Sequence, residues 1–220
     1  MLGVPLFLDR EDAGKQLATA IQLAINHGEY SHLSPVIYGL PRGGLPVAVP
    51  IARHLHCPLT AIIAKKITLP DHPELAVGAV TADGSVLWSP YRPENLQVQE
   101  TALEQAQTKA REQFNQFSPH CPSVDVEGKL AILVDDGIAT GMTMLAAAQA
   151  LGMQKPASLW MAVPVAPLEM IPYLETACDQ ILVLAKPSPF FSVSRFYEYF
   201  PQVTTEAALL CLEKQQSWLI

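Results

Sequence analysis

The sequence lacks the features by which several classes of protein are recognised. Lys and Arg number 14 against 21 Asp and Glu, giving a formal net charge of −7 at pH 7, so it has no excess of the basic residues that bind nucleic acid. No apolar run approaches the roughly 18 residues of a membrane-spanning helix. The N-terminal segment has no basic start and too short an apolar stretch for a signal peptide. We therefore expect neither a nucleic-acid nor a membrane partner.

Cysteine is sparse and shows no metal-binding or disulfide pattern. The chain has 4 cysteines, and none of them forms a C-x-x-C pair with another. Scattered cysteines of this kind are typical of free thiols in a reducing compartment. We therefore predict a cytoplasmic protein without disulfides.

The chain is rich in apolar residues, which occur in segments with helical spacing that alternate with short apolar runs. Half of the 220 residues are hydrophobic, which suits one domain with a buried core. Spacings of three and four predict helices, and short apolar runs predict strands. Expected helices cover residues 10–27 (after the cap Asp9), 45–55, 95–117, 140–153, 167–175 and from 205; expected strands cover 35–40, 59–67, 130–134, 158–166 and 180–185, with a hairpin over 76–88 turning at Asp83–Gly84. Pro50 predicts a kink or a later start in the second helix.

The central strands are continuously apolar, which indicates burial on both faces. An alternation of such strands with helices predicts an α/β fold, with an open, mostly parallel sheet and helices on both faces. Ligands of such sheets bind at the carboxyl ends of the strands. Three polar segments follow strands here: "PRGG" at 41–44, the lysines at 65–66, and "DDGIATG" at 135–141.

The segment "DDGIATGMT" combines two kinds of binding group. Gly137 and Gly141 allow a tight turn that exposes backbone N–H groups, and a helix beginning near residue 140 adds its own. Such a turn suits a phosphate, to which the two threonines add hydroxyl donors. Asp135 and Asp136 are acceptors, which suit sugar hydroxyls or a cation. Together these groups predict a site for ribose 5-phosphate.

Other phosphate-binding motifs fit less well. A Walker A loop needs Lys after its last glycine, where this chain has Met142. The dinucleotide fingerprint G-x-G-x-x-G is absent, and a receiver-type acidic pair would lie near the start of its domain. The simplest alternative is that Asp136–Gly137 is only a turn and Asp135 only a helix cap.

The segment "ILVDDGIATGMT" resembles the phosphoribosyl diphosphate (PRPP) signature of type I phosphoribosyltransferases. "DREDAG", "GLPRGGLPVA", "KKITLPDHPELAVGAV" and "FFSVSRFYEYF" are similar to a branch of bacterial phosphoribosyltransferases whose acceptor is unassigned. The similarity covers nearly all of residues 5–210 and is weakest over 90–128.

The resemblance implies a role for each segment. Asp135 and Asp136 would bind the ribose hydroxyls, and Mg²⁺ directly or through water. The 5-phosphate would bind to Gly137, Ile138, Ala139, Thr140, Gly141, Met142 and Thr143. Pyrophosphate would bind to Pro41, Arg42, Gly43 and Gly44, where the Pro41–Arg42 peptide bond is expected to be cis. Lys65 and Lys66 could assist, although neighbours on a strand point opposite ways, so that one would face solvent. The catalytic set would be Arg42, Lys66, Asp135 and Asp136.

The resemblance also implies a division of the chain. A core of residues 30–186 would carry a hood, built from the N-terminal segment and residues 187–220, and a mobile lid at 67–90. Phe191 in the hood could stack on a planar acceptor, and Glu74 in the lid is a candidate base. Transferases for 6-oxopurines have an acidic residue where this chain has Ala139, so hypoxanthine and guanine are disfavoured acceptors.

The sequence therefore predicts a Mg²⁺-dependent phosphoribosyltransferase of nucleotide metabolism, which transfers the phosphoribosyl group of PRPP to a small nitrogenous acceptor and releases pyrophosphate. A homodimer is common in the superfamily. Two alternatives stay open at this point: a non-catalytic sensor of PRPP or nucleotides, and phosphorolysis or hydrolysis at the ribose 1-position.

Overall fold

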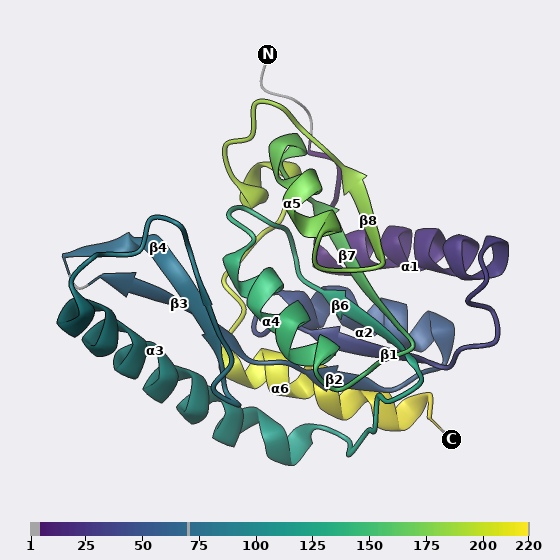
Figure 1. Ribbon diagram of the computed structural model, residues 1–220. Coiled ribbons are helices and arrows are strands. Elements are labelled where there is room, and N and C mark those ends of the chain that lie inside the picture. The colour runs from purple at the N-terminus through teal and green to yellow at the C-terminus, as the bar shows by residue number, and fades with distance from the viewer. Residues whose placement is uncertain (1–4, 70, 220) are drawn as a thin grey trace.

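A five-stranded parallel sheet forms the centre of the protein (Figure 1). The computed structural model describes residues 5–69 and 71–219, without the side chains of residues 73 and 74. The strands, in spatial order, are β2 (Leu59–Ala61), β1 (Pro35–Gly39), β6 (Leu130–Val134), β7 (Ser158–Val165) and β8 (Gln180–Ala185). Every neighbouring pair is parallel. The predicted α/β class is confirmed.

Helices cover both faces of this sheet because alternate strand residues point to opposite sides. Ile37, Ile132 and Trp160 pack against one group of helices, formed by α1 (Arg10–His27), α2 (Gly44–Leu55) and α6 (Thr205–Glu213). Their neighbours Tyr38 and Leu133 pack on the other side, against α4 (Met142–Gly152) and α5 (Ile171–Glu175). No helix within the described residues is long and apolar enough to cross a bilayer.

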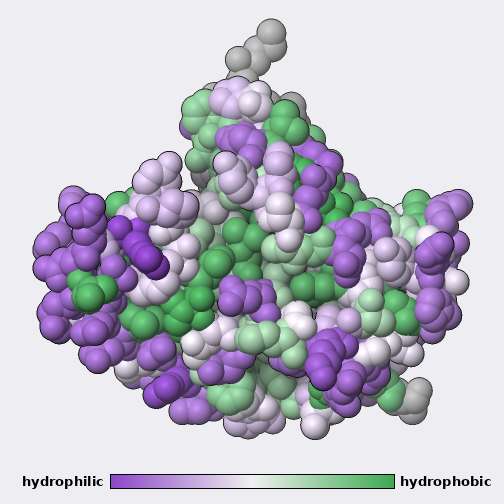
Figure 2. Space-filling view, in the orientation of Figure 1, coloured by the Kyte–Doolittle hydropathy of each residue, from purple (hydrophilic) through white to green (hydrophobic). Residues whose placement is uncertain are grey.

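A second, antiparallel sheet stands beside the first and has its own small core. It consists of β3 (Ala64–Leu69), β4 (His72–Thr81) and β5 (Val86–Trp88), and helix α3 (Leu96–Phe117) packs on it. The buried residues between sheet and helix are Ile67, Val77, Val80, Ala102 and Ala106. The outer surface of this lobe is hydrophilic, and apolar residues gather where it meets α4 (Figure 2). The segment predicted as a lid thus belongs to a packed layer; its mobility stays a prediction.

The single strand predicted over residues 59–67 is wrong. The chain leaves the parallel sheet after Ala61 and enters the antiparallel sheet at Ala64, where Lys65 and Lys66 pair with β4. Ile62 donates its N–H to Gly39 O at 3.2 Å, and Ile63 O accepts the N–H of Ala82 at 3.2 Å. The apolar residues 61–64 continue across the change of sheet without a break, so the sequence pattern does not reveal it.

Two distant segments meet to form the hood. Phe7 and Tyr197 form an isolated parallel bridge, and their rings lie 5.3 Å apart. The short 3₁₀ helix η3 (Val193–Phe196) precedes this bridge. We predicted that the hood would extend to residue 220, but α6 and Trp218 instead pack into the core beside α2. The amphipathic pattern of α6 predicts an apolar face and does not say which element that face covers.

The remaining 3₁₀ helices are η1 (Ser118–His120), η2 (Leu168–Met170) and η4 (Lys214–Ser217). Asp9 caps α1 as predicted, since its side chain accepts the N–H of Asp12 at 2.8 Å. Pro50 lies inside α2 and does not delay the start of that helix.

Helices α1 and α2 touch at Gly14. A Cβ on Gly14 would lie 2.4 Å from Val47 O and 2.4 Å from Pro50 Cγ. Gly14→Ala should therefore lower the free energy of unfolding by about 1–3 kcal/mol through overpacking, although alanine is intrinsically the better helix former. Urea unfolding followed by circular dichroism measures this.

The matched control is Gly152→Ala at the end of α4, where a Cβ would meet nothing within 4 Å. We expect this variant to be neutral or slightly stabilised. Equal effects of the two substitutions would contradict a close contact between α1 and α2.

Candidate functional site

The loops that follow β1 and β6 meet at the carboxyl edge of the parallel sheet. Strand order reverses at β1, because β2 lies on one side of it and β6 on the other. Leu40 donates its N–H to Val134 O at 2.9 Å, which joins the two loops where they begin. Such a reversal opens the crevice in which α/β sheets bind ligands.

Two glycines at the start of α2 allow a close approach of the loop that carries Asp135 and Asp136, which we call the acidic loop. A Cβ on Gly43 would lie 2.1 Å from Oδ2 of Asp136, and one on Gly44 would lie 2.6 Å from Val134 O. Any side chain at either position would push the loop away. The Pro41–Arg42 peptide bond just before them is cis, which confirms the prediction made for it.

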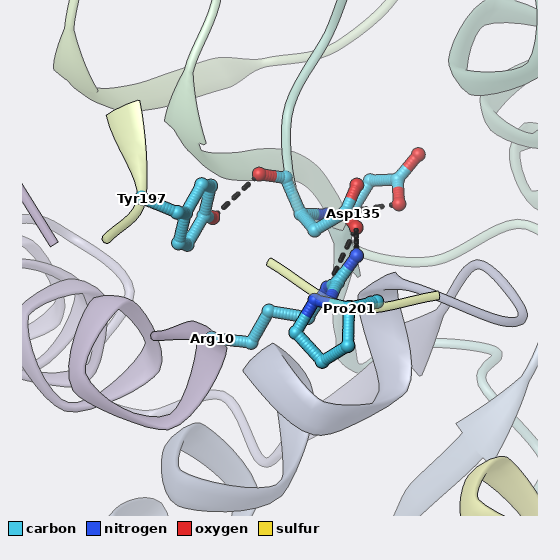
Figure 3. A network of polar contacts seen from close by, with 5 residues as sticks. Arg10, Asp135, Tyr197 and Pro201 are labelled. Atoms are coloured by element: carbon cyan, nitrogen blue, oxygen red, sulfur yellow. Dashed lines mark hydrogen bonds and ion pairs between the residues drawn. The ribbon is translucent and has the colours of Figure 1, made fainter. Parts of the chain in front are cut away.

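Asp136 is held by Arg10, the first residue of α1 (Figure 3). Both Nε and Nη2 of Arg10 donate to Oδ2 of Asp136, each at 2.8 Å. Nη1 donates to Pro201 O at 2.8 Å, and the guanidinium carbon lies 3.7 Å from the ring centre of Phe200. The Arg10 side chain is 10% exposed and that of Asp136 is 17% exposed, so this is a largely desolvated ion pair.

The rest of the acidic pair is also held. The Tyr197 hydroxyl donates to the backbone carbonyl of Asp136 at 2.6 Å, and the Asp136 N–H donates to Oδ1 of Asp135 at 2.8 Å. Burial raises the pKa of Asp135, and the neighbouring Asp136 raises it further, while the Asp136 N–H, Arg10 and Lys66 oppose the rise. Burial also raises the pKa of Asp136, against the opposing effect of Arg10. Two carboxylates at one loop therefore depend on nearby cations to stay charged.

The predicted phosphate turn leads directly into α4. Gly141 caps that helix with a φ of +72°, a left-handed conformation that favours glycine. Ala139 and Thr140 are exposed, and Thr143 is half-buried in the first turn of the helix. Ile138 differs from the prediction that it binds substrate. Its side chain is 3% exposed and its N–H donates to Val165 O at 2.8 Å, so it anchors the turn within the protein.

The two lysines of β3 face different surroundings. Lys65 is half-buried, and its pKa is lowered first by burial and then by the charges of Arg42 and Lys109. Lys66 is exposed, and its charge acts on Asp135. Alternation along the strand explains the difference.

Two cavities adjoin Arg42. One of about 510 Å³ lies between its loop and α3, and its charged lining consists of the cations Arg42, Lys65 and Lys109 and one carboxylate, Glu112. The other, of about 400 Å³, lies toward the hood, and its lining includes Arg10, Arg42, Asp136 and Phe200. Arg42 therefore lies between the acidic loop and the cavity that Lys65 and Lys109 line.

Phe191 and Glu74 were predicted to act on the acceptor. Phe191 is 68% exposed in the hood, and the guanidinium of Arg195 lies 4.5 Å from its ring centre. The Glu74 side chain lies outside the described residues. Within those residues no group of three or more His, Cys, Asp or Glu forms a candidate metal cluster.

Three residues of this region were not singled out from the sequence: Arg10, Lys109 and Tyr197. One signal was available for Arg10. An arginine in the first turn of a helix faces the positive end of the helix dipole, which is unfavourable without a partner. The partner, Asp136, lies 126 residues away in the sequence.

The fold and the site together define an α/β protein in which an acidic loop and the Arg42 loop meet at the switch point of a parallel sheet. Residues 8–172 match the family model described as phosphoribosyl transferase domain. The chain therefore belongs to the phosphoribosyl transferase domain family.

Similar proteins agree with this membership. The chain is 32% identical over 213 residues to "Putative phosphoribosyl transferase Rv0571c" of Mycobacterium tuberculosis strain H37Rv, and equally to its counterpart MT0597 in strain CDC 1551. These matches cover 95% of this chain and 47% of the relatives, so the chain spans about half the length of those relatives. The crystal structure of TT1426 from Thermus thermophilus is 33% identical with a TM-score of 0.78, covering 95% of this chain and 98% of that one.

Replacement of Gly43 tests the close contact with Asp136. We expect Gly43→Ala to force the Asp136 carboxylate away from Arg10, because the new Cβ would overlap Oδ2. The free energy of unfolding should fall by about 3 kcal/mol, since a buried ion pair is broken. Chemical denaturation measures the loss, and a crystal structure of the variant would show the displaced carboxylate. An unchanged stability, with Arg10 still bound to Asp136, would contradict the contact.

Proposed function

We propose that this chain catalyses Mg²⁺-dependent transfer of a phosphoribosyl group between PRPP and a nitrogenous base or related acceptor, with release of pyrophosphate. One observation carries the proposal. The acidic pair and the glycine–threonine turn lie on a single loop at the switch point of the sheet, opposite the Arg42 loop. A phosphorylated sugar needs acceptors for its hydroxyls and N–H or hydroxyl donors for its phosphate, and this loop carries both.

The ribose 5-phosphate would bind along the loop from Asp135 to Thr143. The exposed residues Ala139 and Thr140 and the first turn of α4 would offer N–H and hydroxyl donors to the phosphate. Asp135 and Asp136 would accept hydrogen bonds from the two ribose hydroxyls. Ile138 is left out of this set, because its N–H and side chain are already engaged.

Pyrophosphate would bind around Arg42. Arg42, Lys65 and Lys109 line one cavity together with a single carboxylate, Glu112, and no ion pair joins any of the three cations to a carboxylate in the described part of the chain. Cations that face one another repel unless an anion lies between them. A guanidinium fork suits the paired oxygens of a diphosphate. Gly43 and Gly44 would let the backbone of α2 approach the same anion.

The reaction would break the bond between the anomeric carbon and a pyrophosphate oxygen, and the pyrophosphate leaves with the electron pair. A nitrogen of the acceptor then forms a bond to that carbon, and the proton that this nitrogen carried is released to pyrophosphate or water. Arg42 and Lys66 would stabilise the charge that grows on the leaving group, and the loop would hold the sugar in place. Asp135 would also favour the positive charge that develops on the sugar whose hydroxyls it binds.

The residues present fit Mg²⁺ as a partner of the substrate. Mg²⁺ keeps several waters and is usually held by one or two carboxylates together with substrate phosphates. Asp135 meets this requirement directly or through water, because Arg10 occupies only the neighbouring Asp136. When bound, Mg²⁺ would neutralise and orient the oxygens of the leaving group.

Acceptor choice would depend on the hood and on position 139. Ala139 offers no carboxylate to accept a proton from a 6-oxopurine, so we propose that hypoxanthine and guanine are poor acceptors. Phe191 would supply a stacking surface, since a planar base packs well on an aromatic ring. A homodimer in the cytoplasm stays a prediction, and sedimentation of the purified protein tests the oligomeric state.

The proposed binding of the sugar predicts an effect of replacing Asp135. Asp135→Asn should weaken PRPP affinity, measured by isothermal titration calorimetry with Mg²⁺, at least about tenfold, because one charged hydrogen bond contributes roughly 1.5–3 kcal/mol. The exposed Glu127 provides a control of the same charge, and Glu127→Gln should bind PRPP like the unchanged protein.

Pyrophosphate release with a panel of bases then separates an enzyme from a sensor. Failure of the unchanged protein to bind PRPP would contradict the proposed substrate. Rapid use of hypoxanthine would contradict the proposed acceptor preference.

The proposed binding of pyrophosphate predicts an effect of replacing Lys109. Lys109→Gln should weaken the binding of Mg²⁺–pyrophosphate about tenfold and leave ribose 5-phosphate affinity unchanged, because Lys109 lines the cavity beside Arg42, away from the phosphate turn. The control is Arg111→Gln on the same helix, whose side chain is exposed. Calorimetric titration with each ligand measures both affinities. Equal pyrophosphate affinities for the two variants would place the leaving group elsewhere.

A further inference from the structure

Arg10 directs its hydrogen bonds inward, to other parts of the protein. Two of its nitrogens donate to one oxygen of Asp136, and the third donates to Pro201 O. Phe200 covers the face of the guanidinium at 3.7 Å. Arg10 lines the cavity of about 400 Å³, but only 8% of the residue is exposed and each of its guanidinium nitrogens already has a partner in the protein, so we expect it to affect a substrate chiefly through Asp136.

The contact with Arg10 leaves the acidic pair asymmetric. Oδ2 of Asp136 accepts both bonds from Arg10, while Oδ1 of Asp135 accepts the N–H of Asp136. Among the hydrogen bonds of the described residues, the second oxygen of each carboxylate has no partner within the protein. Two neighbouring sugar hydroxyls need two acceptors, and this arrangement presents one from each aspartate.

Arg10 also changes the charge that a substrate meets. Two carboxylates on one loop would repel a phosphorylated sugar, and the repulsion is stronger where water is partly excluded. The ion pair cancels one of the two charges and leaves the loop with a net charge of about −1. The same loop can then offer acceptors to the sugar without the full repulsion of two carboxylates.

The same contacts join the hood to the loop. The segment of Phe7 and the segment of Tyr197 are bridged, and Tyr197 donates to the backbone carbonyl of Asp136 at 2.6 Å. Arg10 contacts both Asp136 and Pro201, so it joins α1, the segment that follows Tyr197 and the acidic loop at one point (Figure 3). The direction of the Asp136 carboxylate is therefore decided by residues outside the loop.

We propose that Arg10 is a positioning residue for substrate binding: through Asp136 it aims one carboxylate oxygen at the ribose hydroxyls and cancels one negative charge of the acidic pair. The inference rests on the proposed function, because it assigns the sugar of PRPP to this loop. It adds a residue of α1, outside the sugar- and phosphate-binding loops, to the determinants of PRPP affinity.

A double-mutant cycle tests the inference. The variants are Arg10→Gln, Asp136→Asn and the pair together, and the measurement is PRPP affinity by calorimetry with Mg²⁺, with Tm recorded in parallel. We expect Arg10→Gln to weaken PRPP binding about tenfold. In the Asp136→Asn background the same change should have less than about a threefold effect, because Arg10 then has no carboxylate to hold.

Two further variants distinguish positioning from a general loss of structure. Arg10→Lys keeps the charge and loses the fork, so its PRPP affinity should lie between those of the unchanged protein and Arg10→Gln. If Arg10→Gln does not fold, the cycle is run with Arg10→Lys in its place. Lys15→Gln, which removes the exposed 2.9 Å ion pair between Lys15 and Glu11 on the same helix, should leave PRPP affinity unchanged.

The outcomes separate this inference from the proposed function. A lower Tm with unchanged PRPP affinity in Arg10→Gln would show a purely structural role and overturn the inference. If the Arg10 change has equal effects with and without Asp136→Asn, Arg10 does not act through Asp136, and this result would also overturn the inference. Absence of PRPP binding by the unchanged protein would overturn the proposed function itself.

Discussion

The structure depends on one electrostatic constraint: two aspartates stand side by side at the end of a fully buried strand. Burial raises the pKa of both carboxyls, and the charge of Asp136 raises the pKa of Asp135 further. The protein meets this constraint with a buried arginine from a different part of the chain, held against Asp136 by two bonds at 2.8 Å. Removal of one partner from such a pair typically costs about 3–5 kcal/mol. The acidic loop and the hood are therefore stabilised together.

The glycines of the Arg42 loop belong to the same arrangement. Gly43 brings the start of α2 within reach of the Asp136 carboxylate, where a side chain would not fit. The free N–H groups at the start of a helix favour a nearby negative charge. Arg10, the start of α2 and Lys66 thus surround the acidic pair with positive charge or partial charge. The Arg42 loop and the acidic loop are close because β1 and β6 are neighbours at the point where strand order reverses.

Much of the fold could be predicted from the sequence, because local spacing determines which segments become helices or strands. The strand over 130–134 and the helix over 10–27 have the predicted bounds. The cis bond at Pro41–Arg42 was expected from a family resemblance and is present. The change of sheet at Ile62 was missed, since the apolar residues 61–64 continue across it without a break. The packing of α6 on α2 was missed because an apolar face does not identify its partner.

The sequence by itself determined the alternation of buried strands and helices, and it placed two carboxylates, two glycines and two threonines on one loop. Local chemistry is sufficient for both conclusions, because hydrophobic period and turn residues act over a few positions. Only the tertiary structure decided that Arg10 holds Asp136, that Lys65 faces Arg42 and Lys109, and that Ile138 turns inward. These contacts join segments far apart in the chain, and the packing that creates them leaves no periodic signal in the sequence.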